Sequence, residues 1–514
     1  MLARINSYAL DGLNGYRVAV EVDVRPGQPR FDVVGLPDTA VKESKERVRS
    51  AIKNSGYFDT PRVVTVNLAP AHTKKEGPIF DLAIALGLLC STEQAGVDER
   101  KMPLQAVNEY VFLGELSLSG EVRRINGVMP MLISAREHGV KKIVIPHANA
   151  NEAKYIRGIE VYAVNNLKEA ISLINGTSMA PIPNSDIVAG DACEAREDFK
   201  FVKGQYAAKR AMEIAAAGGH NITMIGSPGG GKTMLAKCLP GILPAMTEQE
   251  ILETTKIHSI AGILDADSGI VTTRPFRTPH HTASRIALTG GGPSARPGEI
   301  SYAHNGVLFL DELPEYPRTV LEILRQPLED GVVTVSRASR TVEYPASFML
   351  VASMNPCPCG YSGSHTHQCQ CSPAQIQKYM SRISGPLLDR IDLHIQVDEV
   401  GYDELTSDGQ AESSADVRKR VNAARAIQIT RYAGTDVHCN AKMTSEMIKA
   451  HCALDTAGER ILQNAFDKLG LTARAYTRIL KVARTIADLD GAQNISAKHV
   501  AEAVMYRSLD KAVR

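Results

Sequence analysis

The stretch that most constrains the fold of this chain is the octapeptide Gly226-Ser-Pro-Gly-Gly-Gly-Lys232-Thr233. It follows a short apolar run, 222–225, and precedes a run of helical character, 234–239. Strand, glycine loop and helix in that order are the context in which the pattern Gly-x4-Gly-Lys-Thr binds phosphate. Backbone N–H groups of such a loop crowd around phosphate oxygens, and the helix N-terminus adds partial positive charge. The sequence therefore predicts an ATP or GTP site formed by Gly226, Ser227, Pro228, Gly229, Gly230, Gly231, Lys232 and Thr233.

A second nucleotide signal is Gly306-Val-Leu-Phe-Leu-Asp311-Glu312, an apolar run that ends in two carboxylates. An apolar run before Asp-Glu is common at the end of any strand. Because this one lies about 80 residues beyond the glycine loop, in the same α/β domain, a role in nucleotide binding is favoured. We expect Asp311 to hold Mg²⁺ together with the hydroxyl of Thr233, while Lys232 reaches the outer phosphates. Glu312 is placed to orient and deprotonate the attacking water.

Three further residues are predicted to act on the nucleotide. Asn355 follows an apolar strand and is a candidate γ-phosphate sensor. Arg390 lies between apolar runs at a helix-to-strand junction, where it suits an arginine finger that reaches a neighbouring subunit. The alternative for Arg390 is an ion pair within the chain, to Asp389 or Asp392. Arg474 opens a C-terminal helix, and we expect it near the nucleotide as a second phosphate sensor.

Two alternating runs, 332–335 and 341–344, predict a hairpin with Arg337 and Arg340 at its tip. Two arginines at a loop tip are usually a solvated end of a hairpin. In a ring-shaped ATPase they would instead point at whatever passes through the pore. Arg337 and Arg340 are therefore candidate DNA contacts.

Four cysteines follow in two Cys-x-Cys pairs separated by a polar loop: Cys357, Cys359, Cys369 and Cys371. They can supply four thiolates to a tetrahedral Zn²⁺, and His365 or His367 is an alternative fourth ligand. Packed thiols or a redox pair are the other interpretations. Cysteines this dense in a polar segment are poor candidates for a core, so we expect structural zinc.

Composition sets the remaining limits. The chain has 514 residues, which is enough for about three domains. Its net charge of +1 gives no overall field that attracts nucleic acid or membrane, so DNA binding requires a local basic patch or a pore. The N-terminus lacks the pattern of a signal peptide and no apolar run spans a membrane, so we expect a cytoplasmic protein with reduced cysteines.

Patterning predicts an α/β protein. The expected parts are an α+β domain at 1–175, a linker at 176–198, a P-loop α/β core at 199–400 that carries the cysteine insert, and a helical lid at 401–514. In the first domain we expect strands at 16–24 and 31–35, and a helix at 38–55 capped by Asp38. A hairpin is expected from 111–115 and 120–123.

The first domain resembles the proteolytic domain of the Lon family. The matching stretches are Glu76-Gly-Pro-Ile-Phe-Asp-Leu-Ala83, Leu113-Gly-Glu-Leu-Ser-Leu-Ser-Gly-Glu-Val-Arg-Arg-Ile-Asn-Gly127 and Gly139-Val-Lys-Lys-Ile-Val-Ile-Pro146. Lon proteases carry a nucleophilic serine where this chain has Ile79 and an activating lysine where it has Met129. A serine–lysine dyad needs both groups. The resemblance therefore implies a Lon-like scaffold without peptidase chemistry, which serves assembly or partner binding.

The whole chain resembles the AAA+ ATPases, and most closely the magnesium chelatase-like ComM/YifB family. The shared stretches include Gly218-Gly-His-Asn221, Arg277-Thr-Pro-His-His281, Gly298-Glu-Ile-Ser-Tyr-Ala-His-Asn305, Asn355-Pro-Cys-Pro-Cys-Gly360 and Ala483-Arg-Thr-Ile-Ala-Asp488. The resemblance implies a homo-hexameric ring that uses ATP and Mg²⁺. It also implies a helicase that acts on single-stranded and branched DNA, and that migrates DNA branches during natural transformation.

Two other classes of function stay open. The ATPase core permits a motor subunit of a metal chelatase, although the Lon-like domain and cysteine insert are not features of those subunits. The third class is a Lon-type remodelling ATPase. Ile79 and Met129 argue against proteolytic activity in this class, because they replace the serine and the lysine.

Overall fold

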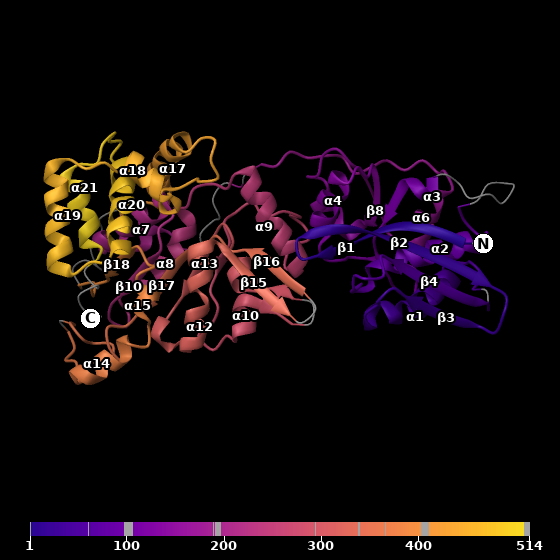
Figure 1. Ribbon diagram of the computed structural model, residues 1–514, viewed down its shortest axis with the longest axis horizontal. Helices are drawn as coiled ribbons and strands as arrows, with labels where there is room; N and C mark the ends of the chain where they lie inside the picture. Colours follow the sequence, from indigo (N-terminus) through magenta and orange to yellow (C-terminus); the bar gives the residue numbers. More distant parts are fainter. Residues whose placement is uncertain are drawn as a thin grey trace. The chain divides into compact units, whose positions relative to one another are not determined.

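The computed structural model describes residues 2–59, 61–96, 106–188, 190, 197–292, 295–337, 340–364, 366–401 and 411–507 (Figure 1). The chain forms two compact units. Unit 1 comprises Met1–Val188, Ile251–Val271 and Pro293–Arg296, and unit 2 comprises Ala189–Glu250, Thr272–Gly292 and Pro297–Arg514.

Unit 1 is built on a seven-stranded sheet of order β3-β4-β2-β1-β5-β8-β9. Its strands are β1 (Leu2–Asp11), β2 (Asn14–Arg25), β3 (Arg30–Val34), β4 (Val63–Ala69), β5 (Tyr110–Phe112), β8 (Lys142–Pro146) and β9 (Glu160–Val164). Strand β2 pairs antiparallel with β1 and β4, whereas the other neighbours pair in parallel. The expected α+β domain is therefore confirmed.

Helices cover both faces of this sheet. The longer ones are α1 (Thr39–Asn54), α2 (Asp81–Ser91), α4 (Val128–Glu137) and α6 (Leu167–Ile174); the short ones are η1 (Pro78–Phe80), α3 (Ala106–Glu109), η2 (His147–Asn149) and α5 (Ala150–Ala153). Because side chains of a strand alternate between faces, Tyr110 and Phe112 of β5 join the apolar cluster under α2, and Val111 joins the one under α4. The predicted cap of α1 is confirmed, since Asp38 accepts a hydrogen bond from Val41 N–H.

Two expectations for unit 1 were incomplete. The expected strand 16–24 pairs antiparallel with β1, a strand that the sequence patterns did not predict. The hairpin expected from 111–115 and 120–123 is only a two-residue ladder, β6 (Glu115–Leu116) with β7 (Val122–Arg123). Tyr110–Phe112 instead enters the main sheet, because its alternating apolar side chains are buried on both faces there.

A segment that we assigned to the ATPase core, 251–271, belongs to unit 1. It contains most of α9 (Glu248–Ala261). Ser259 donates its hydroxyl to the Glu152 carboxylate at 2.7 Å, and its carbonyl accepts from Gly127 N–H at 3.0 Å. Glu152 is buried, so these polar contacts tie the segment to the Lon-like domain across more than 100 residues of sequence.

Unit 2 is built on a five-stranded parallel sheet of order β11-β14-β17-β10-β18. The strands are β10 (Ile222–Ile225), β11 (Phe276–Arg277), β14 (Val307–Leu310), β17 (Met349–Met354) and β18 (Leu393–Gln396). In such sheets ligands bind outside the carboxyl ends of the strands. The expected P-loop α/β core is confirmed.

The other elements of unit 2 surround this sheet. Its helices before residue 400 are η3 (Phe199–Phe201), α7 (Tyr206–Gly218), α8 (Lys232–Cys238), η4 (Leu239–Gly241), α10 (Arg285–Thr289), α11 (Glu299–Tyr302), η5 (Leu313–Glu315), α12 (Arg318–Ile323), α13 (Arg325–Asp330), α14 (Pro373–Met380) and α15 (Gly385–Leu388). Two small antiparallel ladders accompany them, β12 (Gly290–Gly291) with β13 (Arg296–Pro297), and β15 (Val332–Arg337) with β16 (Arg340–Pro345).

The C-terminal region is helical, as expected. It contains α17 (Ser414–Arg431), η6 (Asn440–Lys442), α18 (Ser445–His451), α19 (Thr456–Leu469), α20 (Ala473–Leu489) and α21 (Ala497–Met505). Helices α17 and α20 pack on α7 in one continuous apolar core, so the lid belongs to the same compact unit as the sheet (Figure 1). In the described part of the chain, no helix combines the length and apolarity that a membrane crossing requires.

Candidate functional site

The predicted phosphate loop connects β10 to α8 at the carboxyl end of the sheet. Gly229 and Gly231 adopt left-handed conformations with φ of +81° and +82°, which glycine adopts without strain. Gly226 has no room for a side chain, because a Cβ there would lie 2.2 Å from the carbonyl oxygen of Val397. Glycine is thus required here both for backbone conformation and for the close approach of β18.

Lys232 begins α8 and is buried. Its Nζ donates to the carbonyl oxygens of Gly226 at 2.6 Å and Ser227 at 2.9 Å, and to Asn355 Oδ1 at 3.2 Å. Burial lowers the pKa of Lys232, and the nearby Asp311 and Glu312 charges oppose that shift. The ammonium therefore lies under the loop with oxygen partners that phosphate oxygens can replace, and Asn355 lies beside it.

The carboxylate of Asp311 lies next to the phosphate loop. Thr233 Oγ1 donates to Asp311 Oδ2 at 2.9 Å, and the Ser353 hydroxyl donates to the other carboxylate oxygen. The hydroxyl at the start of α8 and the carboxylate that follows β14 are oxygen ligands of the kind that Mg²⁺ takes. The predicted pair for Mg²⁺, Thr233 and Asp311, is therefore in contact.

Glu312 follows Asp311 in a left-handed conformation with φ of +54°. This turns its side chain away from the strand direction, and the carboxylate is 55% exposed. His281 Nδ1 lies 3.7 Å from its Oε2. An exposed carboxylate beside the phosphate loop has the access to water that a general base needs.

Sequence reasoning assigned no role to Ser353 or His281, which both contact the predicted acidic pair. Ser353 is an inward-facing residue of a buried strand, and nothing in its local pattern marks it. His281 lies in a stretch shared with the family, Arg277-Thr-Pro-His-His281, and that shared stretch could have marked it as a candidate site residue.

Arg390 lies at the amino ends of the strands of the same sheet, opposite the phosphate loop at their carboxyl ends. It immediately precedes the turn into β18, where Asp392 accepts from Asn221 N–H at 3.0 Å. Arg390 is 7% exposed, donates to the Pro386 carbonyl at 2.8 Å and forms an ion pair with Glu329. The ion pair that we considered, to Asp389 or Asp392, is therefore not the one formed.

The length of β10 separates Arg390 from the phosphate loop. Asn221 precedes this strand and Gly226 follows it, which corresponds to about 16 Å at the usual rise per residue. An extended arginine side chain is too short to span that distance. Arg390 therefore lies too far from its own chain's Lys232 to contact the same phosphate.

Arg474, at the start of α20, also lies at the amino ends. Its Nη2 is 3.2 Å from Glu329 Oε1, and its side chain is 54% exposed. We expected it near the nucleotide; within this chain it accompanies Arg390 on Glu329, away from the phosphate loop. The physical reason is that α20 packs against α7 and reaches the amino ends of the strands.

The hairpin of β15 and β16 is present as predicted, with antiparallel register from Val332↔Pro345 to Arg337↔Arg340. The two candidate DNA-contact residues are the outermost pair of this register. Their side chains, and the two residues between them, lie outside the part of the chain that the structure describes.

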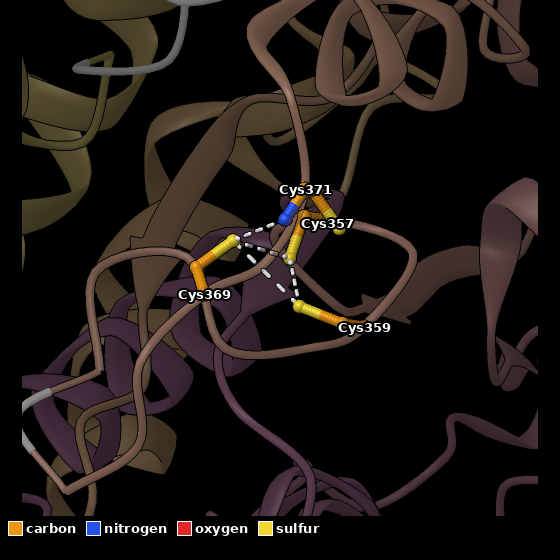
Figure 2. A group of neighbouring side chains, drawn as sticks. All are labelled: Cys357, Cys359, Cys369 and Cys371. Atoms are coloured by element: carbon orange, nitrogen blue, oxygen red, sulfur yellow. Dashed lines mark hydrogen bonds between the residues drawn. The ribbon is translucent and has the colours of Figure 1, made fainter.

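The four cysteines converge directly after β17 (Figure 2). Their sulfur atoms all lie within 4.8 Å of one another, with 3.3 Å between Cys357 and Cys359 and 3.6 Å between Cys359 and Cys369. Zinc–sulfur bonds of 2.3 Å in a tetrahedron place sulfurs about 3.8 Å apart. The four thiols therefore fit one tetrahedral Zn²⁺, and they are not joined as disulfides.

The charges of these thiols also fit a cation. Backbone N–H groups of Tyr361 and Gln370 lower the pKa of the Cys359 thiol to about 6. A backbone hydrogen bond also lowers the pKa of Cys371, but desolvation and the neighbouring sulfurs outweigh it and raise that pKa to about 12. The raised pKa of Cys371 keeps its proton in place without a bound ion, so deprotonation of all four thiols requires a positive ion between them.

Of the two alternative histidine ligands, the structure describes only His367, which is not part of this cluster. The ring of His367 stacks on Tyr361 at 4.7 Å and bonds to the Thr366 hydroxyl. His365 lies outside the described residues. The cysteine segment packs closely on the phosphate loop. Gly360 lies so near Pro228 that a Cβ on Gly360 would be 2.7 Å from the Pro228 ring.

The positions of a Lon-type dyad hold apolar side chains in unit 1. Met129 is fully buried in α4, and Ile79 packs against the same cluster. Neither side chain can take up or release a proton, so this place offers no serine–lysine chemistry.

Three family models match parts of this chain. Residues 198–405 match the family model described as magnesium chelatase, subunit ChlI. Residues 20–149 match that of subunit ChlI of Mg-chelatase, and 411–507 that of its C-terminal part.

Several relatives match almost the whole length of the chain. Competence protein ComM of Haemophilus influenzae is 43% identical over 99% of this chain and 98% of its own length. YifB of Salmonella typhimurium is 41% identical over the same shares. Lon protease 2 of Bacillus subtilis is 27% identical over 33% of this chain and 32% of its own length. The chain belongs to the ComM/YifB family of magnesium chelatase-like AAA+ ATPases.

Proposed function

We propose that this chain is the subunit of a homo-hexameric ATPase ring that translocates on DNA and migrates DNA branches. Its proposed substrates are single-stranded and branched DNA, and its proposed role is recombination of incoming DNA in natural transformation. The competence role rests on similarity to a competence protein over nearly the whole of both chains.

The observation that carries the ring is the separation of two half-sites on one sheet. Lys232, Thr233, Asp311 and Asn355 meet at the carboxyl ends of the strands. Arg390 and Arg474 meet at the amino ends, about 16 Å away along β10. Arginines that act on a γ-phosphate from this edge must act on the nucleotide of another copy.

In the proposed cycle, Lys232 binds the outer phosphates, and Thr233 and Asp311 would hold a Mg²⁺ ion, which would neutralise phosphate charge. Glu312 accepts a proton from the attacking water, and Asn355 fixes the position of that water relative to Lys232. Arg390 and Arg474 supply positive charge in trans as negative charge develops on the transferred group. We also propose that Cys357, Cys359, Cys369 and Cys371 hold a structural zinc that supports the phosphate loop.

The proposed DNA contact is the β15–β16 hairpin with Arg337 and Arg340. Neutralising phosphates would make DNA binding fall steeply with salt. The double variant Arg337→Ala/Arg340→Ala is expected to retain basal ATP hydrolysis and to lose its stimulation by DNA. Arg460→Ala, an exposed arginine on α19, is the matched control and should retain both.

The deciding experiment is branch migration on a labelled four-way junction, with wild-type protein and Lys232→Ala compared at equal concentration. We expect ATP-dependent product from the wild type and none from the variant. The DNA assignment is wrong if wild-type protein hydrolyses ATP without stimulation by DNA and leaves the junction intact.

A chelatase motor is the second candidate, because the three matching family models are named for a magnesium chelatase subunit. Its test is metal insertion by chelatase partner subunits supplied with this chain as the motor. Metal insertion without branch migration would replace the DNA proposal with this one.

A further inference from the structure

A cavity of about 280 Å³ opens at the amino ends of the unit 2 strands, around Arg390. Five cationic side chains and two carboxylates line it, which leaves a surplus of positive charge. The cations are Arg390, Lys442, Arg474, Arg478 and Lys481, and the carboxylates are Glu329 and Asp392.

The two carboxylates differ in how firmly they are held. Asp392 is 5% exposed; it accepts from Asn221 N–H and forms an ion pair with Arg478. Burial alone would raise the pKa of Asp392, but the Arg478 charge and its hydrogen bonds outweigh burial and keep the pKa low. Asp392 is thus a fixed part of the wall.

Glu329 is the removable carboxylate. Its side chain is 51% exposed, and its two oxygens face different guanidinium groups, Oε2 that of Arg390 and Oε1 that of Arg474. Arg390 is also more than nine-tenths buried, and its Nε donor has no hydrogen-bond partner among the described residues. A buried guanidinium with an unused donor beside a basic cavity has capacity for another anion.

We infer that Glu329 is an internal substitute for the anion of this cavity, and that a polyphosphate displaces it from Arg390 and Arg474. A carboxylate bridging two guanidinium groups occupies the place that phosphate oxygens take in such a pair. The chain's own nucleotide is excluded by the length of β10, so the displacing anion comes from outside the chain. This inference rests on the proposed ring, in which the anion is the nucleotide of another copy.

Displacement of Glu329 has a structural consequence. Glu329 lies on α13, which ends at Gly331 and leads directly into β15 of the hairpin. The Gly331 carbonyl accepts from Ala346 N–H at 2.7 Å, so the base of the hairpin is fixed to the end of this helix. Release of Glu329 therefore removes the ion pairs that connect this helix, and through it the base of the hairpin, to Arg390 and Arg474.

The test measures anion binding by the cavity in a protein whose phosphate loop is disabled. In full-length Lys232→Ala protein, tripolyphosphate binding is measured by calorimetry at low salt, alone and combined with Glu329→Gln. Because Glu329→Gln removes the competing charge and keeps the side-chain size, we expect severalfold tighter binding. Glu412→Gln, which alters another half-exposed glutamate that pairs with an arginine, should leave the affinity unchanged.

Adding Arg390→Ala to the Lys232→Ala/Glu329→Gln chain should abolish the tight binding, which separates the cavity from other basic surfaces. Hydrogen exchange in α13 should rise on adding tripolyphosphate to Lys232→Ala, and should not rise when Arg390→Ala is present. Unchanged or weaker binding with Glu329→Gln, in protein that retains its circular dichroism and melting temperature, would overturn the inference. Because no hydrolysis or DNA is involved, this result stands apart from failure of the branch-migration assay.

Discussion

The two ends of the unit 2 sheet bear opposite chemistry. At the carboxyl ends, a glycine loop and a buried lysine lie beside two carboxylates, an arrangement for phosphate and a divalent cation. At the amino ends, two arginines share one glutamate in a basic cavity. Four-residue strands such as β10 keep these ends too far apart to serve one nucleotide. In the proposed ring, these two ends would be the complementary halves of a site that two copies of the chain share.

The largest expected effect comes from disabling the carboxyl end. Lys232→Ala removes the ammonium that bonds Gly226, Ser227 and Asn355, so ATP hydrolysis should fall by at least about 100-fold, as for loss of one preorganised charge contact. Steady-state phosphate release measures it. Lys237→Ala, an exposed lysine on the same helix, is the control and should keep wild-type turnover.

Disabling the amino end should affect turnover and not binding. Arg390→Ala is expected to bind a fluorescent ATP analogue normally and to hydrolyse ATP about 1,000-fold more slowly, the loss expected for an arginine finger.

Mixing inactive Arg390→Ala with inactive Lys232→Ala gives the sharper test of this comparison. Mixed assemblies contain interfaces with an intact loop from one chain and an intact arginine from the other, so activity should partly return. No recovery in a mixture shown to co-assemble would mean that the two ends do not form a shared site.

A smaller effect is expected from the cysteine cluster, because it supports only the carboxyl end. Cys369→Ser should lower bound zinc from one per chain to near zero, measured by atomic emission, and lower the melting temperature. Hydrolysis should fall severalfold, since Cys357 is two residues from Asn355 and Gly360 packs on Pro228.

The control for that variant is Cys439→Ser, outside the cluster, which should keep its zinc. In a Lys232→Ala background, which disables the phosphate loop, tripolyphosphate binding at the arginine cavity should be the same in both cysteine variants. If Cys369→Ser alters that binding as strongly as hydrolysis, the cluster does not act on one end of the sheet alone.

The smallest effect is a pH dependence of unit 2. Burial lowers the pKa of His394, on β18, to about 3, and the Arg507 charge adds to this. Because the unfolded chain takes up this proton near the ordinary value of 6.5, stability is complete above that pH and is lost as pH falls toward 3. The loss at pH 6 should be about 0.8 kcal/mol, measurable by urea unfolding. His394→Gln should flatten the curve between pH 7 and 5, and a parallel curve would contradict the assignment.

Much of the fold followed from local pattern. Glycines at the required positive φ, Asp38 at its cap and the apolar runs of β10 and β14 predicted their elements because those signals act over a few residues. The missing strand β1 and the segment 251–271 depend on partners far along the chain, which no local pattern encodes. The same limit explains why Arg390 was given the wrong ionic partners, since Glu329 precedes it by 61 residues.

Residue types and short spacings were enough to predict the functional groups of the chain: a phosphate loop, an acidic strand end, two cysteine pairs, and apolar residues in place of a peptidase dyad. Those features depend on which functional groups are present and on short spacings. Which of these groups lie together depends on how distant segments of the chain pack. The tertiary structure placed Arg390 and Arg474 on one glutamate at the far edge of the sheet from Lys232, because the parallel strands fix the two edges a strand length apart.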